Sequence, residues 1–201
     1  MKAIIKAFSP KKCEKIFNGE MTIDVCKTAP KLDPPFKVYV YRTKDKVGKA
    51  IVNKVLNGVY GGGKVIGEFV CDKVIKYGYD VISCAKFEVN GAYVEEAKRY
   101  NAGACLSAEE MYEYSNGKPL YGWYITAPKL YDKPKELSEF RKPDFFRDCE
   151  RDCRKNCDME YYRCPTRDSH KASAMAGYCR KKGKNLTRPP QSFMYVEEIE
   201  E

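Results

Sequence analysis

The sequence predicts an α+β protein that is mainly β, with its strands closing into a barrel and short helices at the barrel's rim. Many short segments alternate between apolar and polar residues with period two, as half-buried strands do. Helical patterns are few and short, so the repeated crossovers that a layered parallel sheet needs are missing. A length of 201 residues suits one sizeable core, or one domain with an appendage.

The chain opens with a strand that is followed by a short helix. Residues 3–8 alternate in polarity, and Ser9 followed by Pro10 marks a helix start, because serine caps free N–H groups and proline fits the first turn. The helix should cover residues 10–18, and Gly19 supplies a left-handed cap.

Five further strands and a second helix are expected. Gly67 lies inside a long strand and indicates a bulge or a bend of the barrel. Ser107 with Glu110 three residues later forms a capping box, which predicts a helix over residues 107–114. The further strands are expected at residues 22–28, 37–43, 63–77, 120–125 and 129–130.

Positive charge is concentrated in one segment of the chain. The formal net charge is +9; residues 141–190 hold 14 basic and 7 acidic residues, whereas residues 191–201 hold 0 and 4. The two segments therefore carry +7 and −4. This charge fits either an ordinary solvated surface or a polyanionic partner, for which its concentration in a short segment argues, and it does not distinguish RNA from DNA.

Several classes of protein are excluded by the pattern of apolar residues and cysteines. The sequence has no run of 18 or more apolar residues, and its first residues alternate instead of forming a signal peptide. Five cysteines occur singly among apolar neighbours, as is typical of cytosolic thiols. We therefore expect a cytoplasmic protein without a membrane span. The five are Cys13, Cys26, Cys71, Cys84 and Cys105.

One apparent nucleotide motif does not predict a nucleotide site. Residues 58–64 fit G-x-x-x-x-G-K, but Val65 follows where a phosphate-binding loop has serine or threonine. The next residues have a strand pattern, whereas such a loop is followed by a helix whose N-terminus holds phosphate. We interpret the glycines as a hairpin tip.

The order of segments along the chain resembles an ASCH domain. The similar pieces are the first strand and helix, PFKVYVYRT, GKVIGEFVCD, LYGWYI, LYDKPKELSEF and RPPQSFMYVEEI. The resemblance covers residues 1–140 and 188–199, and the chain resembles small ASCH proteins of phages and Gram-positive bacteria. It implies a PUA-like closed β-barrel with a cleft for RNA or a nucleoside. Residues 141–187 would then be a Cys-rich basic insertion.

The resemblance also shows that residues which carry chemistry in the family are replaced. Family members have the pattern G-x-K-x-x-E-x-R beside the cleft, and its lysine is catalytic in those that hydrolyse 4-acetylcytidine. This chain has Met21 for the lysine, Asp24 for the acid and Cys26 for the arginine. A thioether has no nucleophilic amine and no proton to exchange, so we expect binding and not catalysis.

The predicted ligand contacts are those that a base or a backbone could use in such a cleft. Thr22, Asp24 and Lys27 offer polar contacts, Glu68 lies on a neighbouring strand, and Tyr121 with Trp123 could stack on a flat ring. Each residue could instead have a purely structural role; a single tryptophan such as Trp123, for example, is more often part of an apolar core. No catalytic residue is predicted.

The insertion contains a set of metal-ligand residues. A spacing of four residues between the first three cysteines would place their thiols on one face of a helix. The spacing differs from that of common zinc fingers, so structural zinc, disulfides and free thiols stay open. The candidate ligands are Cys149, Cys153, Cys157, Cys164, His170 and Cys179.

Three functions from different classes follow from these observations. The first is binding of RNA or a modified nucleoside through the ASCH cleft, without catalysis. The second is a hydrolase or ribonuclease with altered active-site residues, which restoring lysine at Met21 would test. The third is a phage-encoded module that binds a protein of the host, with the basic insertion as its contact surface.

Overall fold

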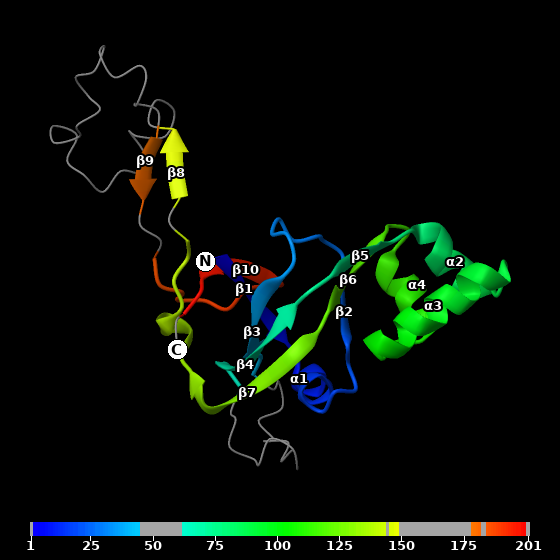
Figure 1. Cartoon of the computed structure of the whole chain (residues 1–201), viewed down its shortest axis with the longest axis horizontal. Coiled ribbons are helices and arrows are strands. Elements are labelled where there is room, and N and C mark those ends of the chain that lie inside the picture. The colour runs from blue at the N-terminus through cyan, green and yellow to red at the C-terminus, as the bar shows by residue number, and fades with distance from the viewer. Residues whose placement is uncertain (1, 45–61, 144, 149–177, 182–183, 200–201) are drawn as a thin grey trace, which may run out of the picture.

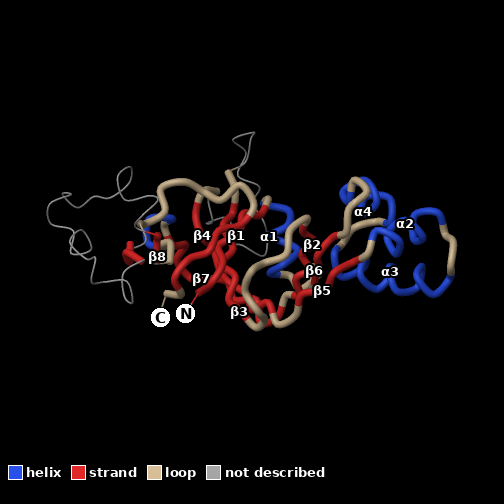
Figure 2. The backbone as a smooth tube through the Cα atoms, turned by 90° about the horizontal axis from the view of Figure 1, so that it is seen from above, coloured by secondary structure: helices blue, strands red, loops and turns tan. Residues whose placement is uncertain are grey.

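The computed structural model describes residues 2–44, 62–143, 145–148, 178–181 and 184–199. Figure 1 shows an elongated molecule with helices α2 (Tyr79–Phe87), α3 (Gly91–Ala104) and α4 (Ala108–Ser115) together at one end and the paired strands β8 (Phe145–Asp148) and β9 (Tyr178–Lys181) at the other. Strands lie between these ends, as the view from above in Figure 2 also shows. The described strands form three sheets, of five, three and two strands.

The five-stranded sheet has the order β10-β1-β3-β4-β7. Strands β1 and β3 are parallel, and the other neighbouring pairs are antiparallel. Gly67 lies beside shifts of register on both sides of β4, in agreement with the predicted bulge. The strands are β1 (Lys2–Phe8), β3 (Phe36–Arg42), β4 (Lys64–Cys71), β7 (Thr126–Lys135) and β10 (Phe193–Glu197).

The three-stranded sheet is antiparallel, with the order β2-β6-β5. Its strands are β2 (Ile23–Cys26), β5 (Val74–Tyr77) and β6 (Leu120–Tyr124). Because side chains alternate along a strand, one face of this sheet meets the first core and the other meets the helices. The three-stranded sheet, called the small sheet below, therefore lies between the five-stranded sheet and the helical end of the molecule.

Four α-helices and one short 3₁₀ helix complete the described fold. Helix α1 (Pro10–Phe17) is capped by Ser9, whose side chain accepts a hydrogen bond from the backbone N–H of Lys12. Helix α4 (Ala108–Ser115) begins with the predicted capping box of Ser107 and Glu110. The remaining helices are α2 (Tyr79–Phe87), α3 (Gly91–Ala104) and η1 (Leu137–Glu139).

Three apolar cores hold these layers together. The first fills the space between the two larger sheets and includes Phe8, Ile16, Phe69 and Trp123. The second lies on the opposite face of the five-stranded sheet. The third joins the small sheet to helices α2, α3 and α4 and contains Ile23, Val25, Tyr77, Ile82, Ala104, Met111 and Leu120.

Most predicted elements are confirmed, with two exceptions. The single strand predicted over residues 63–77 is wrong, because β4 and β5 are separate strands in different sheets. Helices α2 and α3, over residues 79–104, were not predicted. Their weak amphipathic pattern explains this, since their buried positions are few and mostly alanine.

The predicted closure into a barrel is not confirmed, because the described strands divide among three sheets. Strand β8 (Phe145–Asp148) pairs with β9 (Tyr178–Lys181), so the two ends of the Cys-rich segment lie side by side. The boundaries of the insertion stay a prediction. Of the predicted zinc ligands, Cys179 lies on β9, and five lie outside the described residues: Cys149, Cys153, Cys157, Cys164 and His170.

Candidate functional site

A charged cluster lies buried between the five-stranded and three-stranded sheets. The Lys6 ammonium donates hydrogen bonds to the Asp24 carboxylate and to Sγ of Cys26, with 2.5 Å between Nζ and Sγ. The Cys26 thiol in turn donates to Oδ2 of Asp24 over 3.5 Å. The exposed fractions of the three residues are 6%, 1% and 4%. We call these residues the Lys6–Asp24–Cys26 cluster.

Strand alternation explains why the three side chains meet. On β1, Lys6 lies at the same face as Ile4 and Phe8, both of which belong to the first core. On β2, Asp24 and Cys26 share the face opposite that of the third core. The two strands belong to different sheets, so the cluster is an ionic contact between the sheets.

Aromatic rings and a second lysine surround the cluster. The Lys6 ammonium lies 4.6 Å from the ring centroid of Trp123 and 5.5 Å from that of Phe8, in cation–π contact. Lys12 on α1 reaches Oδ1 of Asp24 over 3.4 Å, and its side chain is 42% exposed. Asp24 therefore accepts from one buried and one partly exposed cation.

The electrostatics of the cluster keep it ionised near neutral pH. Burial by itself lowers the pKa of Lys6, but Asp24 and Cys26 outweigh it and hold the pKa above its ordinary value. Burial also opposes ionisation of Asp24, yet the charges of Lys6 and Lys12 keep its pKa below 3.8. Burial, and then the Asp24 charge, raise the pKa of Cys26 to about 12, so the sulfur is a thiol.

An exposed lysine–tyrosine pair lies beside the cluster. The Lys27 ammonium is 4.7 Å from the ring centroid of Tyr114, which is 41% exposed at the end of α4. Burial raises the pKa of Tyr114, and the charges of Cys26, Lys6 and Asp24 also act on it, as expected for a neighbour of the cluster. Lys27 directly follows Cys26 on the chain.

Five of the six predicted ligand contacts lie on or beside two paired strands. Asp24 pairs with Trp123 in the register of β2 and β6. These two are buried, so they lie beneath the surface and not on it. Thr22 and Lys27 are exposed and Tyr121 is partly buried.

The sixth predicted contact, Glu68, lies elsewhere. It pairs with Tyr39 across β3 and β4, on the face of the second core. There it accepts from the Tyr131 hydroxyl over 2.5 Å and forms an ion pair with Lys37. Met21, which replaces the family lysine, is 2% exposed and belongs to the first core, so its thioether fills apolar space.

Two residues of the site were missed by the sequence analysis. Lys6 had a recognisable signal, because it occupies the apolar register of its strand between Ile4 and Phe8. Tyr114 had no such signal, since its approach to Lys27 depends on how α4 packs beside β2.

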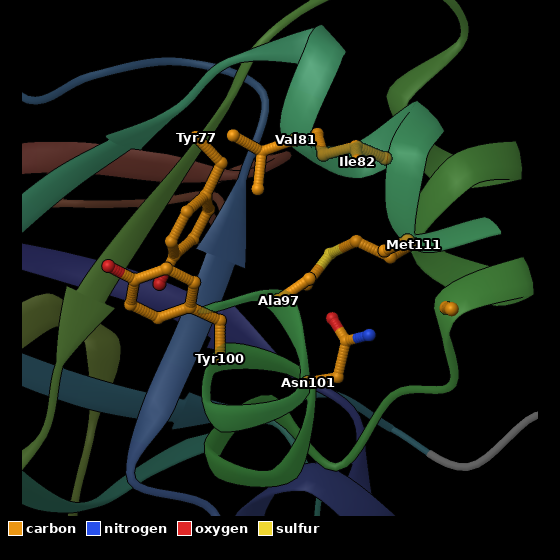
Figure 3. A pocket seen from close by; sticks show the side chains of 9 residues that line it. Tyr77, Val81, Ile82, Ala97, Tyr100, Asn101 and Met111 are labelled. Carbon is orange, nitrogen blue, oxygen red and sulfur yellow. The ribbon is translucent and has the colours of Figure 1, made fainter. Parts of the chain in front are cut away.

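A small cavity lies in the helical part of the molecule. It opens between β5 and helices α2, α3 and α4, with Asn101 at its side and the mutually tilted rings of Tyr77 and Tyr100 at one end (Figure 3). Its free volume of about 10 Å³ has room for a single water molecule at most. A nucleoside does not fit there. The other lining residues are Val81, Ile82, Ala85, Ala97, Ala108 and Met111.

Residues 2–44, 62–143 and 184–199 contain no cluster of three or more His, Cys, Asp or Glu side chains arranged to hold a metal ion. Zinc in the Cys-rich segment stays a prediction. Within the described part of the chain, no helix has the length and apolar character needed to cross a membrane.

Comparison with solved structures finds an ASCH protein of Zymomonas mobilis. A tyrosine-to-phenylalanine variant of it is 14% identical to this chain, covers 68% of this chain and 77% of its own, and has a TM-score of 0.47. The unsubstituted ASCH protein and a serine-to-alanine variant are each 14% identical, with TM-scores of 0.46. They cover 67% of this chain, and 73% and 74% of their own chains.

No protein-family model and no curated relative matches the chain. The structural similarity is too distant to transfer a site residue, so the ASCH family stays a prediction from the sequence.

Proposed function

We propose that this chain binds RNA or a modified nucleoside at the surface formed by Lys27, Tyr114, Thr22 and Lys12, without catalysing a reaction on it. The observation that carries the proposal is the exposed Lys27–Tyr114 pair beside the buried cluster. An exposed aromatic ring offers a face on which a base can stack, and the adjacent ammonium can contact phosphate.

The buried cluster supports this surface from below. Asp24 is fixed by Lys6 and also attracts Lys12, whose side chain extends toward solvent. Lys12 contacts the buried carboxylate, and Lys27 contacts the Tyr114 ring, so each contributes positive charge to the proposed surface. Proteins that bind single-stranded nucleic acid commonly combine positive charge with an aromatic side chain on which a base stacks.

Two pKa shifts argue for binding and not for catalysis. A lysine serves as base or nucleophile only when it is neutral, and Asp24 keeps the pKa of Lys6 above its ordinary value. A cysteine attacks as a thiolate, whereas burial raises the pKa of Cys26 to about 12. We therefore expect no hydrolysis of 4-acetylcytidine by the unsubstituted protein.

Fluorescence anisotropy with a short single-stranded RNA and the matching DNA tests this proposal. Tyr114→Ala should weaken RNA binding by roughly five-fold to 150-fold, because loss of one stacked base costs about 1–3 kcal/mol. Lys27→Ala should weaken binding and lower the slope of log affinity against log salt by about one, since one phosphate contact is lost.

Matched substitutions at other exposed positions serve as controls. Phe87→Ala removes an exposed ring at the tip of the helical end, and Lys133→Ala removes one exposed charge on β7. Both should leave affinity within about two-fold of the original, in keeping with surface positions outside the site. Equal losses in the control and site variants would contradict the proposed surface. Absence of binding to RNA and to nucleosides would exclude the function itself.

The two alternative functions make different predictions in the same experiments. Release of acetate from 4-acetylcytidine by the unsubstituted protein would favour the hydrolase. Retention of a host protein from bacterial lysate after nuclease treatment, without RNA affinity, would favour the protein-binding module.

A further inference from the structure

Apolar and aromatic side chains are exposed at the outer end of the helical part of the molecule. Phe87 and Val89 are 60% and 54% exposed, the two highest values among the large apolar side chains that the structure describes. Between ring centroids, Phe87 lies 5.6 Å from Tyr112, and Tyr112 lies 5.9 Å from Tyr79. We call these four residues the aromatic tip. A patch of this kind is typical of a surface that contacts a protein, a membrane or a ligand.

Packing inside the molecule does not account for the aromatic tip. Helix α2 buries Ile82 and Ala85, whereas Phe87 lies two residues beyond Ala85 and therefore on the other side of the helix. Val89 follows in the turn between α2 and α3. Neither side chain stabilises the fold by its burial, so only a partner can remove their apolar surface from water.

The charge around the aromatic tip selects the class of partner. Residues 79–115 hold 7 acidic and 3 basic residues, a net charge of −4 in a chain whose net charge is +9. One of the basic residues, Lys86, forms an ion pair with Glu109 across α2 and α4. An acidic surface repels the phosphates of nucleic acids and anionic lipids, and it attracts a basic protein surface. The exposed acidic residues next to the tip are Asp80, Glu88 and Glu113.

This chain itself carries a segment of the opposite charge. Residues 141–190, called the basic segment below, have a net charge of +7. Strands β8 and β9 belong to this segment, and they lie at the opposite end of the elongated molecule from the helices (Figure 1). Because the acidic and the basic ends lie far from each other in one molecule, they meet when two molecules lie end to end.

We propose that the aromatic tip of one molecule binds the basic segment of a second copy. The contact is head to tail, so each joined pair keeps one unused tip and one unused basic segment. Association therefore continues into short chains of molecules as the protein concentration rises. The contact is separate from the proposed ligand surface, because Tyr114 lies two residues after Tyr112, on the other side of α4, where it contacts Lys27.

Sedimentation of the full chain, after nuclease treatment and with a thiol reductant, tests the proposal. At low salt the weight-average mass should rise with protein concentration from the 23.1 kDa of one chain. High salt should reverse the rise, because it screens the attraction between the two ends. Phe87→Ala should weaken association about ten-fold or more, as loss of a central aromatic anchor does. Tyr114→Ala, which removes an exposed ring outside the tip, should leave association within about two-fold of the original.

Two complementary variants test the head-to-tail arrangement. The tip variant combines Phe87→Ala with Glu88→Lys. The basic-segment variant combines Arg180→Glu with Lys181→Glu, which lowers the net charge of residues 141–190 from +7 to +3. Each variant alone should associate far more weakly than the unsubstituted protein. An equimolar mixture should form dimers and stop there, since each pair has one intact tip and one intact basic segment, and both are used.

Charge reversal at other exposed positions serves as the matched control. Lys31→Glu with Lys133→Glu changes the net charge of the chain by the same amount as the basic-segment variant, at exposed positions outside both surfaces. This control should associate as the unsubstituted protein does, because the attraction depends on where the charge lies and not on the total.

Three results would each overturn the proposal. One is a mass that stays at 23.1 kDa at every protein concentration in low salt. Another is association that Phe87→Ala leaves unchanged, which would place the contact away from the tip. The third is a mixture of the two complementary variants that is no heavier than either variant alone.

Discussion

The two faces of the five-stranded sheet carry the same kind of ion pair in different surroundings. On the first face, Lys6 and Asp24 are almost fully buried, with side chains 8% and 1% exposed. On the second face, Lys37 and Glu68 lie 3.3 Å apart with side chains 22% and 13% exposed. Water can replace a lost partner more readily on the second face. The degree of burial, and not the mere presence of an ion pair, therefore decides how much the pair contributes to the free energy of unfolding.

The partners of each pair also differ. Lys6 is held between the Trp123 ring, Asp24 and Cys26, which come from the small sheet. Lys37 instead bridges Glu68 and Glu198, which lies just after β10. The buried pair therefore joins two sheets, whereas the partly exposed pair fastens the C-terminal segment to one sheet.

Asp24→Ala should have the largest effect on stability. It leaves the Lys6 ammonium buried without its carboxylate, which costs about 3–5 kcal/mol of the free energy of unfolding. Chemical denaturation measures the loss. Asp33→Ala, at an exposed carboxylate, is the matched control and should change stability by less than about 0.5 kcal/mol. A loss below about 1 kcal/mol for Asp24→Ala would show that the buried pair contributes no more than a surface pair.

Lowering the pH should reduce the stability of the unsubstituted protein more than that of a variant without the Asp24 carboxylate. Because the folded pKa of Asp24 is lower than 3.8, its contribution is fully present well above pH 3.8 and is lost as pH falls through the folded pKa. Asp24→Asn lacks this contribution at every pH. The difference in stability between the two proteins should therefore shrink as pH falls below about 5. Denaturation curves across this range measure it, and a constant difference would contradict the lowered pKa.

Glu68→Gln should have the smallest effect, about 1 kcal/mol or less. Glutamine keeps an acceptor for the Tyr131 hydroxyl and loses only the charge that faces Lys37. Added salt should reduce this effect further, because partly exposed charges are screened. Comparison of Glu68→Gln and Asp24→Asn in low and high salt measures the contrast directly. Equal losses in the two variants would remove the distinction between the faces.

The starts of α1 and α4 and the positions of β1 and β3 were predictable because their signals are local. Ser9 and Pro10 fix the start of α1, and Ser107 with Glu110 fixes the start of α4, through contacts within four residues. Alternation placed β1 and β3 for the same reason. The break between β4 and β5 could not be predicted, since both halves have apolar strand patterns and only their partners differ.

The candidate site was predictable only in part. Thr22, Asp24 and Lys27 were found through a resemblance of the sequence, and the structure places them together on or beside β2. Glu68 was expected only on a neighbouring strand, and its face could not be predicted, because the pairing of β4 with β3 and β7 decides which side chains of β4 face the first core.

The sequence by itself determined the mixed α+β composition, the N-terminal caps of α1 and α4, and the alternation of side chains along β1 and β3, because these depend on neighbours a few residues away. Only the tertiary structure decided that Lys6 meets Asp24 and Cys26, which are 18 and 20 residues away on a strand of another sheet. The physical reason is that a buried charge is tolerated only where a distant partner compensates its loss of water, and that partner is fixed by packing.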